Sequence, residues 1–90
     1  MTLFEVTWSG QAREELADLW TRADATARRA ILAAVQAIGG RLQDQPGNQG
    51  ETRGDGVRAD TADPLGLLFK IDETRWIVTV LHVWNLRRQP

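Results

Sequence analysis

The amino-acid sequence predicts an α+β domain in which an antiparallel two-helix hairpin covers one face of a small sheet. Residues 2–8 alternate with the period of two that is typical of a strand. Residues 9–42 contain two stretches with the spacing of amphipathic helices, and residues 57–84 return to alternation. The expected order is therefore β-α-α-β-β-β: an N-terminal strand, the helical hairpin, and a three-stranded antiparallel meander.

The N-terminal strand and the first helix are predicted to meet at Ser9. In the segment TLFEVTW, the side chains of Phe4, Val6 and Trp8 share the face that we expect to be better buried. Ser9 is a favourable N-cap, and apolar side chains recur along one side of residues 12–23. The strand must pair away from its sequence neighbour, so we expect it beside the last strand, which alone is apolar enough to be central.

The second helix has its apolar stripe over residues 27–42, with Asp24 or Thr26 as its N-cap. The short connection between the two helices predicts that they run antiparallel. Gly39 and Gly40 each cost a helix roughly 1 kcal/mol relative to alanine. We therefore expect the last turn of this helix to fray.

The rest of the chain reads as a loop followed by strands. Residues 46–56 hold four glycines and no aliphatic side chain, which predicts one long loop. Strands are expected at Val57–Thr61, Leu65–Ile71 and Trp76–Trp84, with a tight turn at residues 72–74.

The last strand is apolar on both of its alternating faces. One face is expected to hold Ile77, Leu81 and Val83. The other is expected to hold Trp76, Val78, Val80 and Trp84. Because two helices can cover only one of these faces, we expect the second to meet a partner.

The four tryptophans divide in the same way. Trp8 and Trp20 lie on apolar stripes and are predicted to be core residues. Trp76 and Trp84 are either anchors for a partner or, for one of the two, filling between the sheet and the helices.

Composition limits the chemistry that the chain can perform. Its 90 residues, with a net charge of −1, fit one domain over residues 1–90. There is no cysteine and only one histidine, so we expect no metal site and no cofactor. Neither a signal peptide nor a membrane-spanning run is evident, which favours a cytoplasmic protein with no membrane partner. The pI of about 5.7 restricts any nucleic-acid contact to a local patch.

Two groups of polar residues are candidates for function. His82 is either a general acid or base or, as we favour, a half-buried strand histidine with a satisfied hydrogen bond. Four arginines are candidates for a phosphate-binding patch: Arg53, Arg58, Arg87 and Arg88. Acidic residues occupy the same stretch, so a self-neutralising surface is the simpler interpretation.

Several strings, in this order and spacing, resemble one family. FEVTWSGQAREELADLW, ILAAVQAIGGRLQDQP, GETR and PLGLLFKIDETRWIVTVLHVW are together similar to the RelE/ParE toxins of bacterial type II toxin–antitoxin systems. The resemblance implies a cytoplasmic toxin, connected with plasmid stabilisation, that an antitoxin tail inactivates by lying along it as helix and strand. It also implies a homodimer or a heterotetramer with that antitoxin.

The resemblance leaves two mechanisms open. In the RelE branch, which cleaves mRNA on the ribosome, an arginine, a histidine and a tyrosine look catalytic, and the matching positions here are Gly66, Trp84 and Asn85. A nuclease would then depend on Glu51, Arg58 and His82. The ParE branch, which resembles gyrase inhibitors, often has Leu-His followed by arginine in the last strand, as at Leu81, His82 and Arg87.

We favour the ParE-like interpretation, a toxin that binds a protein target such as gyrase and is not an enzyme. The rivals are a ribosome-dependent mRNA endonuclease and a non-toxic interaction domain. The residues expected to contact target or antitoxin are Arg53, Arg58, Leu81, His82, Trp84, Arg87 and Arg88.

Overall fold

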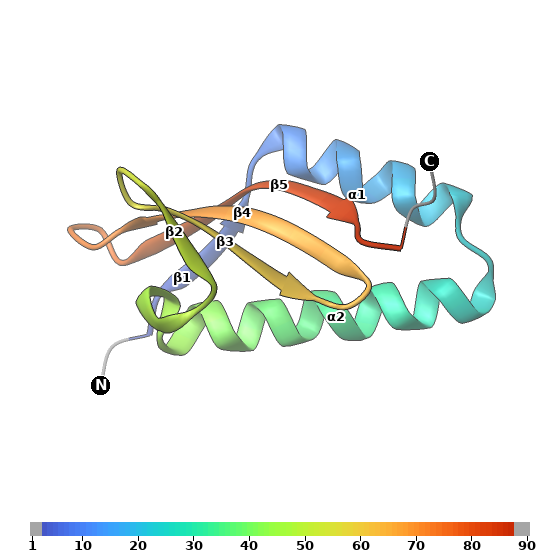
Figure 1. Ribbon diagram of the computed structural model, residues 1–90, viewed down its shortest axis with the longest axis horizontal. Helices are drawn as coiled ribbons and strands as arrows, with labels where there is room; N and C mark the ends of the chain where they lie inside the picture. Colours follow the sequence, from blue (N-terminus) through green and yellow to red (C-terminus); the bar gives the residue numbers. More distant parts are fainter. Residues whose placement is uncertain (1–2, 88–90) are drawn as a thin grey trace.

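Five strands, two α-helices and a short 3-10 helix make up the structure, a computed structural model that describes residues 3–87 (Figure 1). In chain order they are β1 (Glu5–Trp8), α1 (Gly10–Arg22), α2 (Ala25–Asp44), η1 (Pro46–Asn48), β2 (Glu51–Gly54), β3 (Val57–Ala62), β4 (Leu65–Asp72) and β5 (Ile77–Asn85). The sheet order is β1-β5-β4-β3-β2, with β1 parallel to β5 and all other pairs antiparallel. The predicted α+β class and the place of the first strand beside the last are confirmed.

The sheet has one strand more than expected, because β2 lies inside the segment predicted as a loop. Glu51 and Thr52 pair with Ala59 and Arg58 of β3. The hairpin turns at Asp55 and Gly56, which both have positive φ angles (54° and 79°). Asp-Gly is the sequence signature of such a two-residue hairpin turn. The sequence therefore contained a sign of this hairpin, but residues 46–56 lack the aliphatic side chains by which a strand is usually predicted.

Both helices begin where the sequence predicts. The Ser9 hydroxyl accepts the N–H of Ala12 at 3.0 Å, and the Asp24 carboxylate accepts the N–H of Ala27 at 2.8 Å. The expected fraying of α2 is wrong, since the helix continues without a break to Asp44. Its side chains at 38 and 42 are buried in the core on either side of the two glycines, and this tertiary packing outweighs the low helix propensity of glycine.

A β-bulge in β5 changes which side chains face the helices. Phe69 of β4 pairs with Val80, but the preceding Leu68 pairs with His82, so Leu81 is the extra residue. Beyond the bulge, the side chains that the sequence pattern assigns to one face of β5 lie on the other face. The expected division of the strand into two faces is therefore wrong: Val83 joins the core with Val78 and Val80, whereas Trp84 lies on the opposite side.

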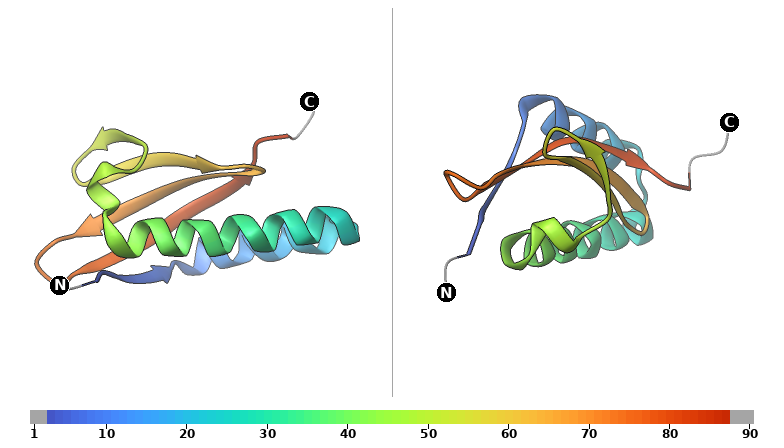
Figure 2. Two further views of the ribbon diagram at one scale, coloured as in Figure 1. Left: turned by 90° about the horizontal axis from the view of Figure 1, so that it is seen from below. Right: turned by 60° about the vertical axis from the view of Figure 1, so that its left-hand side comes forward.

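The core lies between the sheet and α2, with α1 along the β5 edge (Figure 2). Its buried apolar residues are Ala12, Ile31, Ala34, Ile38, Leu42, Ala62, Leu65, Leu67, Phe69, Val78, Val80 and Val83. Neither α1 nor α2 covers the opposite face of the sheet (Figure 2). None of the helices in residues 3–87 is long and apolar enough to span a bilayer.

The tryptophans follow the prediction only in part. Trp8 packs against the core while staying partly accessible. The core position expected for Trp20 is wrong, because 39% of the residue is exposed. Trp76 and Trp84 are 44% and 40% exposed, so neither fills the space between the sheet and the helices.

Candidate functional site

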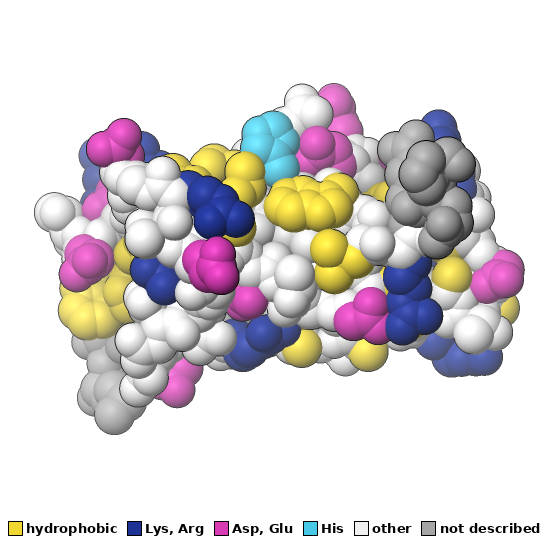
Figure 3. Space-filling model, viewed as in Figure 1, with side chains coloured by type: hydrophobic (Ala, Val, Ile, Leu, Met, Phe, Trp, Pro, Cys, Tyr) yellow, Lys and Arg dark blue, Asp and Glu magenta, His cyan; other side chains and the backbone are white. Residues whose placement is uncertain are grey.

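The side of the sheet away from α2 is the first candidate surface, which we call the outer face. The strand register places Ala59, Leu68, Lys70, His82 and Trp84 on it. In Figure 3 the histidine lies next to hydrophobic side chains on this face. Leu68 and Ala59 are half-buried there, so the centre of the face is apolar although neither α1 nor α2 covers it.

Trp84 lies directly over Gly66 on the neighbouring strand. The two residues are register partners, and a Cβ atom added at position 66 would lie only 2.5 Å from Cε2 and Nε1 of the indole. Any side chain at position 66 would therefore displace the ring. Because Gly66 has no side chain, it leaves the space that the exposed Trp84 indole occupies.

His82 belongs to a cluster that closes the free edge of β5. Strand β1 ends at Trp8, and beyond that point α1 supplies the hydrogen-bond partners of β5. Ser9 Oγ donates to the carbonyl of Leu81 at 3.0 Å, and the N–H of Val83 donates to Glu15 Oε1 at 3.0 Å. His82 Nδ1 lies 3.3 Å from Glu15 Oε2. Glu15 thus connects α1 to the last strand through both of its carboxylate oxygens.

These contacts change the acidity of Glu15. Burial alone raises the pKa of its carboxyl group, but the hydrogen bonds from Val83, Gln11 and His82 outweigh burial and lower the pKa below its ordinary value. The carboxylate is therefore favoured by the folded state. Among residues 3–87 no group of three or more histidine, cysteine or acidic side chains is placed to hold a metal ion.

Arg58 faces the inner side of the sheet, as the register partner of the buried Phe69. Its Nε donates to the carbonyl of Gln49 at 2.7 Å and its Nη2 to that of Gly50 at 3.0 Å. These bonds join β3 to the segment between η1 and β2. The structure therefore does not bring Arg58 together with His82, because the two side chains lie on opposite faces of the sheet.

The remaining charged candidates are engaged in ion pairs at the surface. Arg53 Nη1 lies 3.5 Å from the carboxylate of Glu51 within β2. Arg87 makes a two-pronged contact with Asp63, in which Nε lies 3.1 Å from Oδ1 and Nη2 bonds Oδ2. The guanidinium lowers the pKa of the Asp63 carboxyl through these hydrogen bonds. Arg88 lies outside the described residues.

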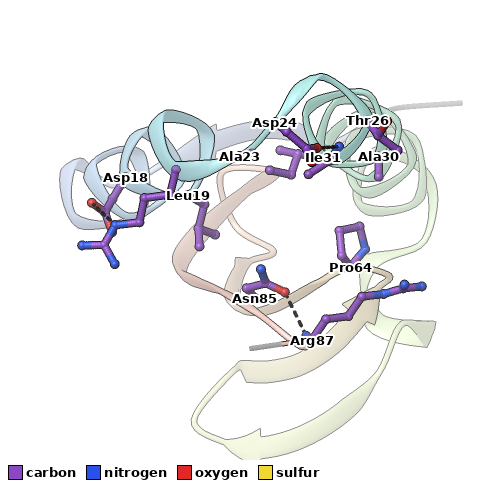
Figure 4. A pocket seen from close by; sticks show the side chains of 12 residues that line it. Asp18, Leu19, Ala23, Asp24, Thr26, Ala30, Ile31, Pro64, Asn85 and Arg87 are labelled. Atoms are coloured by element: carbon purple, nitrogen blue, oxygen red, sulfur yellow. Dashed lines mark hydrogen bonds and ion pairs between the residues drawn. The ribbon is translucent and has the colours of Figure 1, made fainter. Parts of the chain in front are cut away.

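Arg87 also borders a cavity of about 620 Å³ between the α1–α2 turn and the end of β5 (Figure 4). Its N–H donates to Asn85 Oδ1 at 2.8 Å, shown in the figure as the dashed line between these two residues. Pro64, Leu19 and Ile31 supply apolar lining. Of its polar lining residues, Asp18 and Arg22 form an ion pair, and Asp24 accepts the N–H of Ala27 as the N-cap of α2.

A second surface, which sequence reasoning missed, is a groove of about 710 Å³ between α1, α2 and β1. We call it the β1 groove. Its apolar lining includes Val6, Trp8, Leu16, Trp20, Ile31, Leu32 and Val35. Arg28 stacks over the Trp20 ring at 5.3 Å and donates from Nε to the carbonyl of Trp20. The sequence contains one sign of this groove. Trp20 and Leu32 are large apolar residues, and both line the groove and stay exposed.

The two-helix hairpin and the parallel pairing of β1 with β5 in an otherwise antiparallel sheet define a small α+β toxin fold, that of the RelE/ParE proteins. A chain of the RelBE2 toxin–antitoxin complex from Mycobacterium tuberculosis superimposes with a TM-score of 0.74 at 25% identity, over 94% of this chain and 93% of that one. A chain of the chromosomal ParDE system of P. aeruginosa gives a TM-score of 0.74 at 16% identity, over 93% and 97%.

The isolated E. coli RelE toxin has the same fold, with a TM-score of 0.58 at 13% identity over 96% of this chain and 87% of that chain. No family model matches the chain, and neither does any curated protein. The structural neighbours confirm the resemblance to RelE/ParE toxins. The RelBE2, archaeal RelE–RelB and intact E. coli RelBE structures are complexes of a toxin with its antitoxin, and this chain shares the fold of these systems.

Proposed function

We propose that the chain is the toxin of a toxin–antitoxin pair, that it acts in the cytoplasm by binding a protein target through its outer face, and that a cognate antitoxin neutralises it. The observation that carries the mechanism is Trp84 lying over Gly66. By the resemblance, position 66 matches the catalytic arginine of a nuclease and position 84 its histidine, so a glycine covered by an exposed indole stands where those two groups are expected.

The arrangement of the polar candidates favours binding over cleavage. General acid–base catalysis requires groups that converge on one reacting atom. Here Arg58 is held by two backbone carbonyls on the inner side, whereas His82 contacts Glu15 at the β5 edge. Glu51 is exposed on β2 and pairs with Arg53. The three residues that an endonuclease would use do not form one site.

The outer face has the composition of a protein-binding hot spot. An exposed tryptophan beside half-buried aliphatic residues is typical of the centre of an interface. Arg53 and Arg87 are each paired with a carboxylate, so Lys70 is the cation that the register places on the outer face without an ion pair to any residue between 3 and 87. This favours a protein over the phosphate backbone of a nucleic acid.

The decisive experiment is controlled expression in a bacterium, with and without the neighbouring gene. We expect growth arrest by the wild type and rescue by the antitoxin. Trp84→Ala should abolish arrest while the protein stays folded, because truncating a central anchor costs about 2 kcal/mol or more of binding energy. Trp76→Ala, which removes a similarly exposed ring from the β4–β5 turn, is the matched control and should remain toxic.

Three outcomes separate the rival functions. Full toxicity of Trp84→Ala contradicts an outer-face target site, and absence of arrest by the wild type identifies a non-toxic interaction domain. Cleavage of mRNA on programmed ribosomes, lowered about 10²-fold or more by Arg58→Ala or His82→Ala, identifies an endonuclease. Gyrase supercoiling assays with purified protein test the one named target, and sedimentation of the toxin–antitoxin complex tests the homodimer and heterotetramer.

A further inference from the structure

Helix α1 holds His82 through both of its neighbours in β5 and through its own ring. On one side, Ser9 Oγ donates to the carbonyl of Leu81 at 3.0 Å. On the other, the N–H of Val83 donates to Glu15 Oε1 at 3.0 Å. The imidazole lies against the same carboxylate, with Nδ1 3.3 Å from Glu15 Oε2. The backbone and the side chain of His82 are therefore both fixed next to the β-bulge of the strand.

The contact with Glu15 decides which nitrogen of the ring carries the proton. Burial raises the pKa of the Glu15 carboxyl group, but its hydrogen bonds outweigh burial and favour the ionised form. An ionised carboxylate can only accept hydrogen bonds, so the adjacent Nδ1 of His82 has to be a donor. In the neutral ring the other nitrogen, Nε2, then has no proton and is a hydrogen-bond acceptor.

This acceptor is accessible on the outer face. Among residues 3–87, Nε2 of His82 has no hydrogen-bond partner, and 48% of the side chain is exposed. The register sets His82 opposite Leu68 and Trp84 opposite Gly66, so the two rings lie two residues apart on the same face. In Figure 3 the imidazole borders the hydrophobic side chains of this face. A fixed acceptor therefore lies at the margin of the apolar centre.

We propose that Glu15 is a positioning residue, which holds the neutral His82 ring in the Nδ1-protonated tautomer and so makes Nε2 an acceptor for the target protein. The target then contributes an N–H or O–H donor beside the apolar surface that covers Trp84. This inference rests on the proposed function, because it gives the chemistry of the partner at the same face. A carbonyl or carboxylate at that place would meet a second acceptor, so the site selects against it.

The variant Glu15→Gln separates the charge of this residue from its shape. Its amide oxygen can still accept the Val83 N–H, which leaves the amide NH₂ group toward Nδ1 of His82. A donor at this place requires an unprotonated Nδ1, so the proton moves to Nε2 and the outer face presents a donor in place of an acceptor. Glu14→Gln, which changes the exposed neighbouring residue in the same way, is the matched control.

The test is nitrogen NMR of the untagged full-length protein. His82 is the single histidine of the chain, so the imidazole signals need no assignment. Protonated and unprotonated ring nitrogens have well-separated chemical shifts, and varying the pH identifies the neutral ring. In the neutral ring we expect a protonated Nδ1 and an unprotonated Nε2 in the wild type and in Glu14→Gln. Glu15→Gln should show the reverse.

Controlled expression in a bacterium tests whether the target uses the acceptor. Glu15→Gln and His82→Ala should each require about tenfold more protein than the wild type for growth arrest, a loss in the range of one unmade hydrogen bond. Because both changes remove the same contact, the double variant should be no weaker than either single one. Glu14→Gln should be as toxic as the wild type.

A protonated Nε2 in the neutral ring of the wild type overturns the proposal, as does a tautomer that Glu15→Gln leaves unchanged. An inverted tautomer with undiminished toxicity overturns the role of Nε2 in the target contact. Failure of the proposed function has a different signature. In that case the wild type does not arrest growth or Trp84→Ala arrests it fully, whereas the spectra still decide the tautomer.

Discussion

At the scale of single residues, Glu15 explains how a helix substitutes for a missing strand. Its carboxylate accepts the Val83 N–H at the point where β1 no longer covers the β5 edge. An unpaired N–H at a partly buried sheet edge would be costly. The same carboxylate contacts His82, so the single histidine of the chain already has a partner.

Removing the Glu15 carboxylate should therefore destabilise the protein. Glu15→Ala leaves the Val83 N–H without its acceptor, and we expect a loss of about 1–2 kcal/mol in the free energy of unfolding. Urea denaturation at neutral pH measures it. Glu14→Ala, one position away on the same helix and exposed, is the control and should change the stability by less than about 0.5 kcal/mol. Equal losses for the two variants would contradict this role of Glu15.

The stability that the charge of Glu15 confers should also depend on pH. Because the folded state lowers the pKa of this carboxyl, the charged form is favoured by folding. The contribution is present above the ordinary glutamate pKa of about 4.3 and is lost as the pH falls through the lower folded-state value. Wild type should thus lose more stability than Glu15→Gln between neutral and acidic pH. Parallel pH profiles of the two proteins would contradict this.

At the scale of elements, α2 shows that packing outweighs propensity. The helix passes through Gly39 and Gly40 without a break, because side chains one turn apart are anchored in the core. Neither glycine is needed for space, since a Cβ atom at either position would have no neighbour within 4 Å. The two glycines therefore only weaken the helix.

Replacing the exposed glycine should stabilise the protein. Gly40→Ala should raise the free energy of unfolding by about 1 kcal/mol, because alanine loses less conformational entropy in a helix. Thermal and urea denaturation measure the change. Gly50→Ala is the contrasting variant and should be destabilising, since Gly50 has a φ of +65° and a Cβ there would collide with the carbonyl of Ala59. A destabilised Gly40→Ala would show that α2 needs its flexibility.

At the scale of the whole molecule, the structure presents two apolar surfaces on different sides. The outer face is centred on Trp84, and the β1 groove is walled by Trp20 and Leu32. Arg53 and Arg87 are each paired with a carboxylate, and the formal net charge is only −1. Apolar burial at about 25 cal/mol per Å² is therefore expected to supply most of the binding energy.

Partner binding should accordingly be insensitive to salt. We expect the affinity for the cognate antitoxin to fall less than tenfold between low and high salt, because few unpaired charges take part. Calorimetric titration at the two salt concentrations measures it, with Arg87→Ala expected to have little effect. Binding that weakens steeply with salt and is lost in Arg87→Ala would instead support an electrostatic interface.

The sequence by itself determined the α+β class, the two helix N-caps, the strand pairs of the meander and the place of β1 beside β5. These follow from short-range signals, since period, capping residues and turn residues act within a few positions. Asp-Gly at 55–56 predicts a hairpin as well, although the surrounding polar residues concealed strand β2.

Only the tertiary structure decided which surfaces are exposed. The bulge at Leu81 turns Trp84 outward, and it depends on pairing with β4, which no local pattern records. In the same way, Trp20 has the periodicity of a core residue but faces a groove, because α1 and α2 leave β1 uncovered between them. Arg58 is directed to loop carbonyls by the register of β3. Periodicity identifies the apolar side of an element, whereas the contacts on that side depend on elements distant in the sequence.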